Sequence, residues 1–269
     1  MNSLQACLTD LDLDATRART IALSITMQEQ EAELPMHRHR KGQLVIALCG
    51  GVVCKAQGGL WMVPPGSGVW IPGDVMHSNH VTANGRICLF FVEPDVPGMP
   101  DTCCTLSLTP MVIEMVKHLA RYQPPDDATD PQLVLVAEVV LGELRKAEIA
   151  ALHLPIPDDP ALTKIANALV ADPADRSSMA EWAERVAMSE RSLARLVSTK
   201  TAMSFGRWRQ QLHIIVALQR LAAGLSVQRV SDELGYESVS AFITMFKKAL
   251  GQSPARYIAA KERSLAEAL

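Results

Sequence analysis

Hydrophobic and polar positions follow a pattern that occurs twice in the C-terminal part of the chain. The stretch Ser178-Met-Ala-Glu-Trp-Ala-Glu-Arg-Val-Ala-Met188 aligns with Ser226-Val-Gln-Arg-Val-Ser-Asp-Glu-Leu-Gly-Tyr236 at an offset of 48 residues, which becomes 49 after the second turn. The pairs at the later offset include Leu193 with Phe242, Val197 with Phe246, and Ala202 with Gly251. Each copy predicts a short capped helix, a tight turn and a second helix. Two helix-turn-helix units on one chain can read two successive major grooves without a second subunit.

The first unit begins at a helix cap. Ser178 precedes Glu181 by three residues, the spacing at which the hydroxyl and the carboxylate each accept a backbone N–H bond. A second helix starts at the Ser189 cap, and its apolar spacing assigns Leu193, Leu196 and Val197 to the buried side. The opposite side, which we expect to enter the major groove, carries Arg191, Ser192, Ala194 and Arg195.

The reading helix of the second unit has a different chemistry. Its buried stripe consists of Phe242, Met245 and Phe246, and its opposite face carries Val239, Ser240, Ile243, Thr244 and Lys247. That face has no Arg, Asn or Gln before Lys247, so it offers methyl and hydroxyl contacts but no bidentate pairing to guanine or adenine. Direct base readout is therefore expected to depend mainly on the first unit.

An unbroken helical pattern connects the two units from Phe205 to Ala223. At the rise of an α-helix this segment is roughly 28 Å long. A strut of that length can hold two reading helices about one DNA turn, roughly 34 Å, apart on the same face of the duplex. Because straight DNA does not have to match this separation, a bend of the bound site is expected.

The N-terminal part has short apolar runs instead of helical periodicity. The runs are Ile21–Thr26, Gln43–Leu48, Val69–Ile71 and Ile87–Val92, and Gly, Pro and Asn residues separate them. Turn signals at this density predict a small antiparallel β-barrel.

Helical periodicity returns at Pro110–Arg121 and Leu133–Ala151. The second segment has a stripe formed by Leu133, Val136, Val140, Leu141 and Leu144. The stripe has two interpretations, packing against the barrel or the seam of a homodimer, and the pattern favours neither.

Length and proline content predict two domains and an α+β fold class. The 269 residues exceed one ordinary core, and three prolines in His153–Pro160 stop any helix there. We expect a barrel domain at 1–105, a helical packing or dimerisation segment at 106–152, a linker at 153–160 and a DNA-binding domain at 161–269.

Charge divides at the same place. Residues 161–269 hold 15 Lys and Arg against 10 Asp and Glu, a balance of +5, whereas the remainder holds 11 against 19, a balance of -8. This surplus suits phosphate contact by the C-terminal part alone. The six cysteines all lie in the first 104 residues without zinc-ligand spacing, which predicts reduced core thiols. We find no secretory leader and no apolar run long enough to span a bilayer, so the sequence predicts a cytoplasmic location and no membrane partner.

The C-terminal motifs carry a family resemblance. The segments Ser189–Arg195, Phe205–Gln211 and Gly235–Tyr257 are similar to the signature of the AraC/XylS transcription regulators, over roughly residues 160 to 262. The resemblance implies a seven-helix DNA-binding domain whose third and sixth helices read bases. It assigns base-facing positions to Arg191, Ala194 and Arg195 in the first unit, and to Val239, Ser240 and Thr244 in the second. In this pattern Ala202 replaces a usual glycine and His213 stands where arginine is frequent.

A second resemblance concerns the N-terminal part. His37, His39, Gln43, Gly50, Gly66, Pro72 and His77 reproduce the spacing of the two cupin motifs. On a strand His37 and His39 would point the same way, and with His77 they would supply three imidazoles to a divalent transition metal. Gln43 stands in place of the usual glutamate ligand, so the alternative is an effector pocket in which the histidines form hydrogen bonds. Trp61 and Trp70 either wall that pocket for a small planar ligand or fill the core.

Together the resemblances imply a sequence-specific transcription regulator that binds double-stranded DNA and a small effector, and no enzyme. The whole chain resembles a subgroup linked to an efflux transporter, which implies an aromatic effector and a neighbouring transporter gene as target. If the regulator activates transcription, RNA polymerase is a further partner. The competing hypothesis is a metal-dependent cupin enzyme that uses His37, His39 and His77 and carries an autoregulatory DNA-binding domain.

Overall fold

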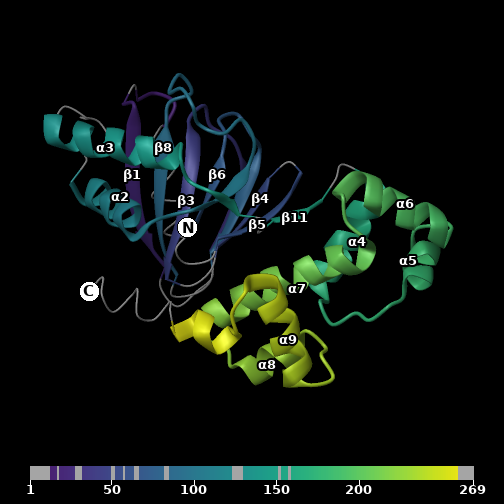
Figure 1. Ribbon diagram of the computed structural model, residues 1–269. Coiled ribbons are helices and arrows are strands. Elements are labelled where there is room, and N and C mark those ends of the chain that lie inside the picture. Colours follow the sequence, from purple (N-terminus) through teal and green to yellow (C-terminus); the bar gives the residue numbers. More distant parts are fainter. Residues whose placement is uncertain are drawn as a thin grey trace. The chain divides into compact units, whose positions relative to one another are not determined.

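The computed structural model describes residues 13–16, 18–27, 32–49, 52–56, 58–63, 67–81, 85–122, 130–150, 153–156 and 159–259. Contacts group the chain into two compact units, Met1–Gln57 with Trp61–Leu152, and Gly58–Leu60 with His153–Leu269. The first is built from β-sheets with two helices, and the second is mainly helical (Figure 1). The predicted α+β class is confirmed.

The strands form two antiparallel sheets. The larger has the order β1-β8-β3-β6-β9-β10, and the smaller has the order β11-β5-β4-β7-β2. The bounds are β1 Thr20–Thr26, β2 Ala32–His37, β3 Gly42–Cys49, β4 Val52–Ala56, β5 Gly59–Val63, β6 Ser67–Ile71, β7 His77–Val81, β8 Arg86–Val92, β9 Cys104–Ser107, β10 Ile149–Ala150 and β11 His153–Pro155. The four apolar runs of the sequence correspond to β1, β8, β3 and β6, which are consecutive neighbours in the larger sheet.

The larger sheet is buried on both faces. Residues 44–47 of β3 are each at most 2% exposed. Val45 and Ala47 belong to the interior cluster between the sheets, whereas Leu44 and Ile46 belong to an outer cluster with α2 (Pro110–Tyr122) and α3 (Pro131–Leu144). Figure 1 shows both helices on one side of this sheet. Burial on two faces explains why its strands have continuous apolar runs instead of an alternating pattern.

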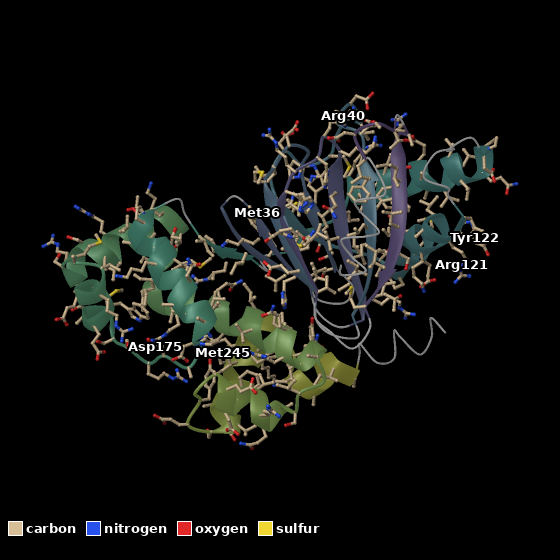
Figure 2. The ribbon with its side chains drawn as sticks, turned by 180° about the vertical axis from the view of Figure 1, so that it is seen from behind. Met36, Arg40, Arg121, Tyr122, Asp175 and Met245 are labelled. Atoms are coloured by element: carbon tan, nitrogen blue, oxygen red, sulfur yellow. The ribbon has the colours of Figure 1, made fainter. Side chains whose placement is uncertain are left out.

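The predicted stripe on α3 packs within its own domain. Leu133, Val140, Leu141 and Leu144 lie in the outer cluster, and Val136 packs against it. Of the two interpretations, the structure therefore supports packing for this stripe. At the end of α2, Tyr122 is exposed (Figure 2). The guanidinium of Arg121 lies 5.9 Å from the centroid of the Tyr122 ring.

The expected helical end at Ala151 is wrong. α3 ends at Leu144, and Ile149 and Ala150 form β10. These two residues pair with Leu106 and Thr105 of β9, which is distant in the sequence. This long-range pairing replaces the helix and leaves no trace in local periodicity.

Within the described residues, six helices that each begin at a polar cap follow in the C-terminal unit. They are α4 Pro160–Ala171, α5 Met179–Arg185, α6 Glu190–Thr201, α7 Phe205–Ala222, α8 Val227–Glu233 and α9 Val239–Leu250, and residues 254–259 are also helical. The caps are Asp159, Ser178, Ser189, Ser204, Ser226 and Ser238, whose side-chain oxygens accept backbone N–H bonds of the first turn. Ser178 and Glu181 form the predicted reciprocal capping box.

The linker, the lengths of the helices and the cysteines add three smaller features to this fold. Within the predicted linker, His153–Pro155 is strand β11 and Asp159 caps α4. Among the described residues, no helix is both long and apolar enough to cross a membrane. The thiols of Cys54, Cys88, Cys103 and Cys104 are free, while Cys7 and the side chain of Cys49 lie outside the described residues.

Candidate functional site

The second helix of the first repeat, α6, presents its predicted reading face to solvent. Arg191, Ala194 and Arg195 are exposed and Ser192 is half-buried, while Leu193 on the other side is fully buried. The Ser192 amide donates to the Ser189 hydroxyl oxygen at 3.1 Å, and that hydroxyl donates to Ser192 Oγ at 2.8 Å. The cap therefore fixes the first turn of α6, which includes Arg191.

The corresponding helix α9 presents smaller groups. Ser240, Thr244 and Lys247 are exposed, and Val239 is half-buried. The Thr244 hydroxyl donates to the backbone oxygen of Ser240 at 2.8 Å. This bond uses its donor, so Thr244 presents a methyl group and acceptor lone pairs on the face that the sequence assigns to DNA.

The cations of the C-terminal unit divide into two groups. Arg185 pairs with Asp175, Arg229 and Arg220 pair with Glu233, and Lys164 donates to a backbone oxygen. Within the part of the chain that the structure describes, the side chains without an ion pair or hydrogen bond are Arg191, Arg195, Lys200, Arg207, Lys247, Lys248 and Arg256. Both reading helices therefore contribute cations that no described residue neutralises, and such groups suit phosphate or base contacts.

A loop between α4 and α5 joins the two repeats. Arg176 donates to the Leu234 oxygen at 3.1 Å and to the Gly235 oxygen at 3.0 Å, and its guanidinium lies 5.0 Å from the ring centroid of Tyr236. Leu234 is the C-cap of α8, and Gly235 follows it in the turn with a φ of 67°. A cation at these carbonyls complements the C-terminal dipole of α8. A Cβ at Gly235 would lie 3.2 Å from the Ala174 oxygen, so the loop backbone also packs against the turn.

His213 on α7 also contacts both the loop between α4 and α5 and the turn of the second helix-turn-helix unit, and we call this set of contacts the joint. Its Nε2 lies 3.0 Å from the Pro173 oxygen and its Nδ1 lies 3.0 Å from the Tyr236 hydroxyl. A carbonyl only accepts, so Nε2–H donates to Pro173 and Nδ1 accepts from Tyr236. Burial, with the positive charges of Arg176 and Arg209, lowers the pKa of His213 to about 4. The ring is thus neutral near pH 7. It links the loop between α4 and α5, through Pro173, to the turn of the second helix-turn-helix unit, through Tyr236.

The N-terminal unit gathers the three predicted histidines. His37 ends β2, His77 begins β7, and His39 lies between β2 and β3. The expectation that His37 and His39 share one strand is wrong, because β2 ends at His37 after a register shift against β7. The rings still converge, with centroids of His37 and His77 4.3 Å apart and those of His39 and His77 5.1 Å apart. One potential ligand atom from each histidine lies within 4.8 Å of the others.

Each ring is oriented by a backbone carbonyl. The Nδ1 atom of His37 donates to the Pro35 oxygen at 2.8 Å, and that of His39 donates to the Lys41 oxygen at 2.7 Å. The Nδ1 atom of His77 donates to the Val75 oxygen at 2.8 Å. Such outer bonds fix the tautomer and leave Nε2 as the inward-facing atom. The Gln43 Oε1 atom lies 3.2 Å from Nε2 of His39 and 2.8 Å from Nε2 of His77. Burial lowers the pKa of His39 and lowers that of His77 to about 4, so both rings are neutral.

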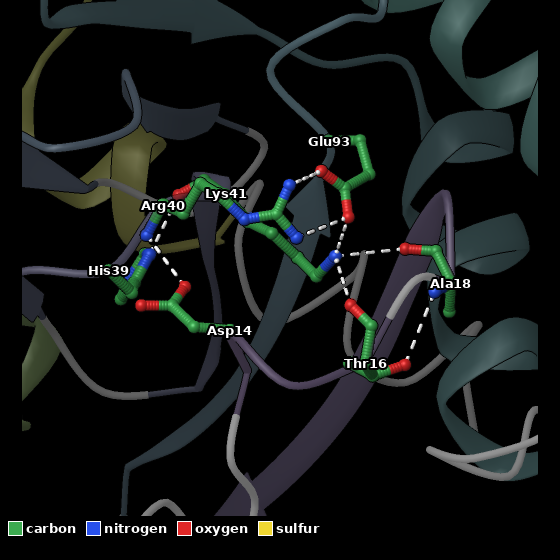
Figure 3. Close-up of polar contacts among 7 residues, drawn as sticks. All are labelled: Asp14, Thr16, Ala18, His39, Arg40, Lys41 and Glu93. Atoms are coloured by element: carbon green, nitrogen blue, oxygen red, sulfur yellow. Dashed lines mark hydrogen bonds and ion pairs between the residues drawn. The ribbon is translucent and has the colours of Figure 1, made fainter.

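The residues that follow His39 hold the segment before β1. Lys41 is fully buried, and its ammonium donates to the Thr16 oxygen at 3.1 Å, to the Ala18 oxygen at 3.0 Å and to the Glu93 carboxylate (Figure 3). All three ammonium donors are therefore satisfied, which permits burial of the charge. Arg40 also pairs with Glu93 at 2.6 Å, and its backbone N–H donates to Asp14 at 2.8 Å. No sequence pattern marked Lys41 as an anchor.

The two tryptophans of the predicted pocket lie on different faces. Trp61 belongs to the interior cluster, as does Phe91, whose ring is 5.3 Å from that of His39. Trp70 belongs to the outer cluster and donates to the Pro100 oxygen at 2.8 Å. Its assignment to the histidine pocket is therefore wrong, because alternation on β6 turns Trp70 away from the interior to which Val69 and Ile71 belong.

Sequence reasoning missed Asn79. It is 2% exposed, and its Oδ1 has no hydrogen-bond partner among the described residues. Asn79 is two residues after His77 on β7 and pairs with Cys54, a member of the interior cluster. An unpaired buried acceptor is costly, so this oxygen marks a place where a ligand donor would be stabilised.

A separate cavity of about 300 Å³ lies between β9, the start of α2 and the end of α3. Its lining includes Leu108, Val112, Leu144 and Lys146, and none of the three histidines belongs to it. The sequence predicts a packing or dimerisation segment in this region and no pocket.

Comparison with known proteins identifies the class. A family described as "AraC-like ligand binding domain" matches residues 23–133, and one described as "Helix-turn-helix domain" matches residues 182–260. With these two domains, the chain belongs to the AraC family of DNA-binding transcription regulators and carries an effector-binding domain.

The relatives NimR and RipA agree with this class. The HTH-type transcriptional regulator NimR of Escherichia coli K12 is 46% identical over 220 residues, which cover 82% of this chain and 80% of NimR. RipA of Corynebacterium diphtheriae is 31% identical over 135 residues, which cover 48% of this chain and 40% of RipA. The crystal structure of ToxT from Vibrio cholerae O395 covers 90% of this chain and 98% of ToxT, with 12% identity and a TM-score of 0.39. NimR and RipA are both named as HTH-type transcriptional regulators, so the chain is assigned to regulation and the enzyme hypothesis is set aside.

Proposed function

We propose that this regulator recognises its operator mainly through α6, that α9 chiefly anchors the second half of the site, and that an effector inside the N-terminal domain controls this binding. The observation that carries the proposal is the contrast between the reading faces. Arg191 and Arg195 on α6 are exposed and unpaired among the described residues, whereas α9 presents Ser240, Thr244 and Lys247. Arginine pairs with guanine through two hydrogen bonds, which hydroxyl groups do not reproduce.

Selection of duplexes from a random library by the full chain tests this assignment. We expect two conserved sub-sites about one helical turn apart, with the stronger base preference in the sub-site that contacts α6. Affinity should fall steeply with salt because each phosphate contact releases counterions. Stronger base preference under α9 than under α6 would contradict the division.

The proposed effector site is the interior around His37, His39, His77 and Gln43. Trp61 and Phe91 belong to the same interior cluster and supply aromatic surface, which supports a small planar effector. Asn79 adds an unsatisfied acceptor for an N–H or O–H group of that effector. The same histidines are the proposed ligands of a divalent transition-metal ion, which would supply a positive charge and a coordination position for a ligand lone pair.

A reporter driven by the promoter beside this gene tests the effector site against a panel of small planar aromatic compounds. His39→Ala should abolish the response to an active compound and leave basal DNA binding intact, because His39 and the reading helices belong to different units. Trp70→Phe is the matched control, since Trp70 faces the outer cluster. An unchanged response of the His39 variant would place the effector elsewhere, for example in the cavity beside Leu108 and Val112.

We also propose a homodimer formed through the outward side of α3. Leu135, Val139 and Val134 are 66%, 48% and 43% exposed, and a Cβ at Gly142 would meet no atom within 4 Å. Leu135, Val139 and Gly142 are spaced along one face of the helix, and burial against a second copy would remove this apolar surface from water. Leu135→Glu should convert the dimer to monomer in sedimentation experiments. A monomeric parent protein at the concentrations used for DNA binding would contradict the proposal.

We propose that the chain acts in the cytoplasm on a neighbouring efflux transporter gene, with RNA polymerase as a partner if it activates. Support comes from the resemblance to the efflux-linked subgroup. Transcript levels of the adjacent genes after deletion of this gene test the target, and an unchanged transporter transcript would contradict it.

A further inference from the structure

The inward-facing atoms of the histidine cluster are all hydrogen-bond acceptors. Each Nδ1 donates its proton to a backbone carbonyl, at 2.8 Å for His37, 2.7 Å for His39 and 2.8 Å for His77. A neutral ring then has only a lone pair at Nε2. The Gln43 oxygen faces two of these lone pairs, at 3.2 Å and 2.8 Å. Four acceptors thus face one another without a hydrogen to share.

Two changes remove this conflict, and glutamine permits both. A cation among the atoms binds the nitrogen lone pairs and the amide oxygen together. Without a cation, rotation of the Gln43 amide by half a turn presents its NH2 group, which donates to His39 and His77 at the same time. A glutamate at position 43 has no such second arrangement, because an ionised carboxylate donates no hydrogen bond.

We propose that Gln43 makes this cluster a reversible binding site for a divalent transition-metal ion, so that the ion itself is a signal read by the effector domain. This inference rests on the proposed effector function of the same interior. The donor set of three imidazole nitrogens and one amide oxygen suits ions such as Zn²⁺, Co²⁺ or Ni²⁺. All four donors are neutral, so the ion keeps its full charge in a buried site and binds less tightly than it would beside a carboxylate.

The cluster is connected to the segment that precedes β1. The carbonyl that fixes the His39 ring belongs to Lys41, whose ammonium holds the backbone oxygens of Thr16 and Ala18. Arg40, between these two residues, binds Glu93 and Asp14 (Figure 3). Ordering of His39 by an ion therefore also orders the loop that anchors Thr16 and Ala18.

Titration of the full chain with Co²⁺ tests the inference. The protein is purified without an affinity tag, stripped with a chelator and dialysed, and bound cobalt is followed by elemental analysis and by its visible absorption. The parent protein should bind one equivalent, show a higher unfolding temperature when loaded, and lose the ion on dialysis against the chelator. Hydrogen exchange at Thr16 and Ala18 should slow on loading. His77→Ala should abolish binding.

Gln43→Glu examines the role of the amide. It should hold Co²⁺ roughly tenfold tighter or more, because a negative ligand replaces a neutral one. Its metal-free form should unfold at a lower temperature than the metal-free parent, because the carboxylate donates to neither ring. If this variant does not fold without metal, refolding on addition of Co²⁺ is the expected result. His80→Ala is the control, since His80 is on the same strand β7 and next to Asn79 on the alternate face.

Two results would overturn the inference. One is a parent protein that binds no Co²⁺. The other is a Gln43→Glu variant whose metal retention and metal-free stability equal those of the parent, or that Co²⁺ fails to refold. Either result removes the proposed metal site, but it leaves the proposed DNA recognition and control by an organic effector standing if the parent still binds its operator and responds to such an effector. Loss of sequence-specific DNA binding by the full chain would instead remove the proposed function, whatever the metal result.

Discussion

The two helix-turn-helix units share a scaffold but differ in what their second helices offer to DNA. α6 presents Arg191 and Arg195 with free guanidinium groups among the described residues, while α9 presents Ser240 and Thr244, whose hydroxyl already donates to the backbone. Both helices begin at a serine cap and bury the same positions of the repeat. The comparison indicates that duplication preserves the packing and leaves the exposed positions to diverge, so specificity can concentrate in one unit.

The units also differ in backbone strain. The turn and helix end of the first unit place Ala187 and Ala202 at φ values of 54° and 56°, in the left-handed region. The corresponding residues of the second unit are Gly235 and Gly251, at 67° and 74°. Only glycine adopts this conformation without steric cost. The unit with the arginine-rich reading face is therefore the more strained one.

The largest expected effect is the loss of folding free energy at low pH through His213, which lies at the joint between the two helix-turn-helix units. The folded-state pKa of His213 is about 4, below the ordinary value of 6.5, so the unfolded chain binds a proton more readily than the folded chain. The contribution to stability is complete above pH 6.5 and is lost as the pH falls toward 4, by up to ~3 kcal/mol. Hydrogen exchange of α7 amides in the full chain, corrected for intrinsic rates, measures this loss.

His213→Gln supplies the control for that experiment. Glutamine retains a donor and an acceptor but does not titrate, so the loss of α7 protection between pH 6.5 and 4 should become smaller. Equal pH dependence in the parent and the variant would show that His213 does not govern the joint.

The next effect compares the reading faces directly. Arg195→Ala should weaken operator binding by about 1–3 kcal/mol and relax the base preference at one position, because a bidentate contact is lost. Thr244→Ala should cost less than about 1 kcal/mol, because its hydroxyl donor is already used. Titration of fluorescent operator duplexes with both variants checks the order. A Thr244 variant weaker than the Arg195 variant would reverse the assignment of the two units.

The smallest effect concerns strain. Ala202→Gly should stabilise the C-terminal domain by about 1 kcal/mol, because the left-handed conformation no longer opposes a Cβ. Gly251→Ala is the mirror experiment and should destabilise by a similar amount, since a Cβ there meets no atom within 4 Å and only the backbone cost remains. The free energy of unfolding of the C-terminal domain is compared between the two variants by hydrogen exchange of α7 amides at increasing urea concentration. Changes of the same sign would refute the strain comparison.

Local sequence predicted much of the fold. Serine caps marked the starts of α5 and α6, and the pattern from Phe205 to Ala223 became α7, which ends at Ala222. The four apolar runs became the central strands of the larger sheet. The actual end of α3 could not be predicted, because β10 forms only through pairing with β9.

The sequence by itself predicted the helix caps, the spacing of the repeat and the three histidines of the cluster, because these are local properties of the chain. Tertiary structure decided which of them meet. It separated Trp70 from the histidines and left Asn79 without a partner. It also brought Arg176 to the second turn and satisfied all three donors of Lys41. These contacts depend on which face of a strand or loop is turned toward a distant segment, and packing of the whole domain fixes that choice.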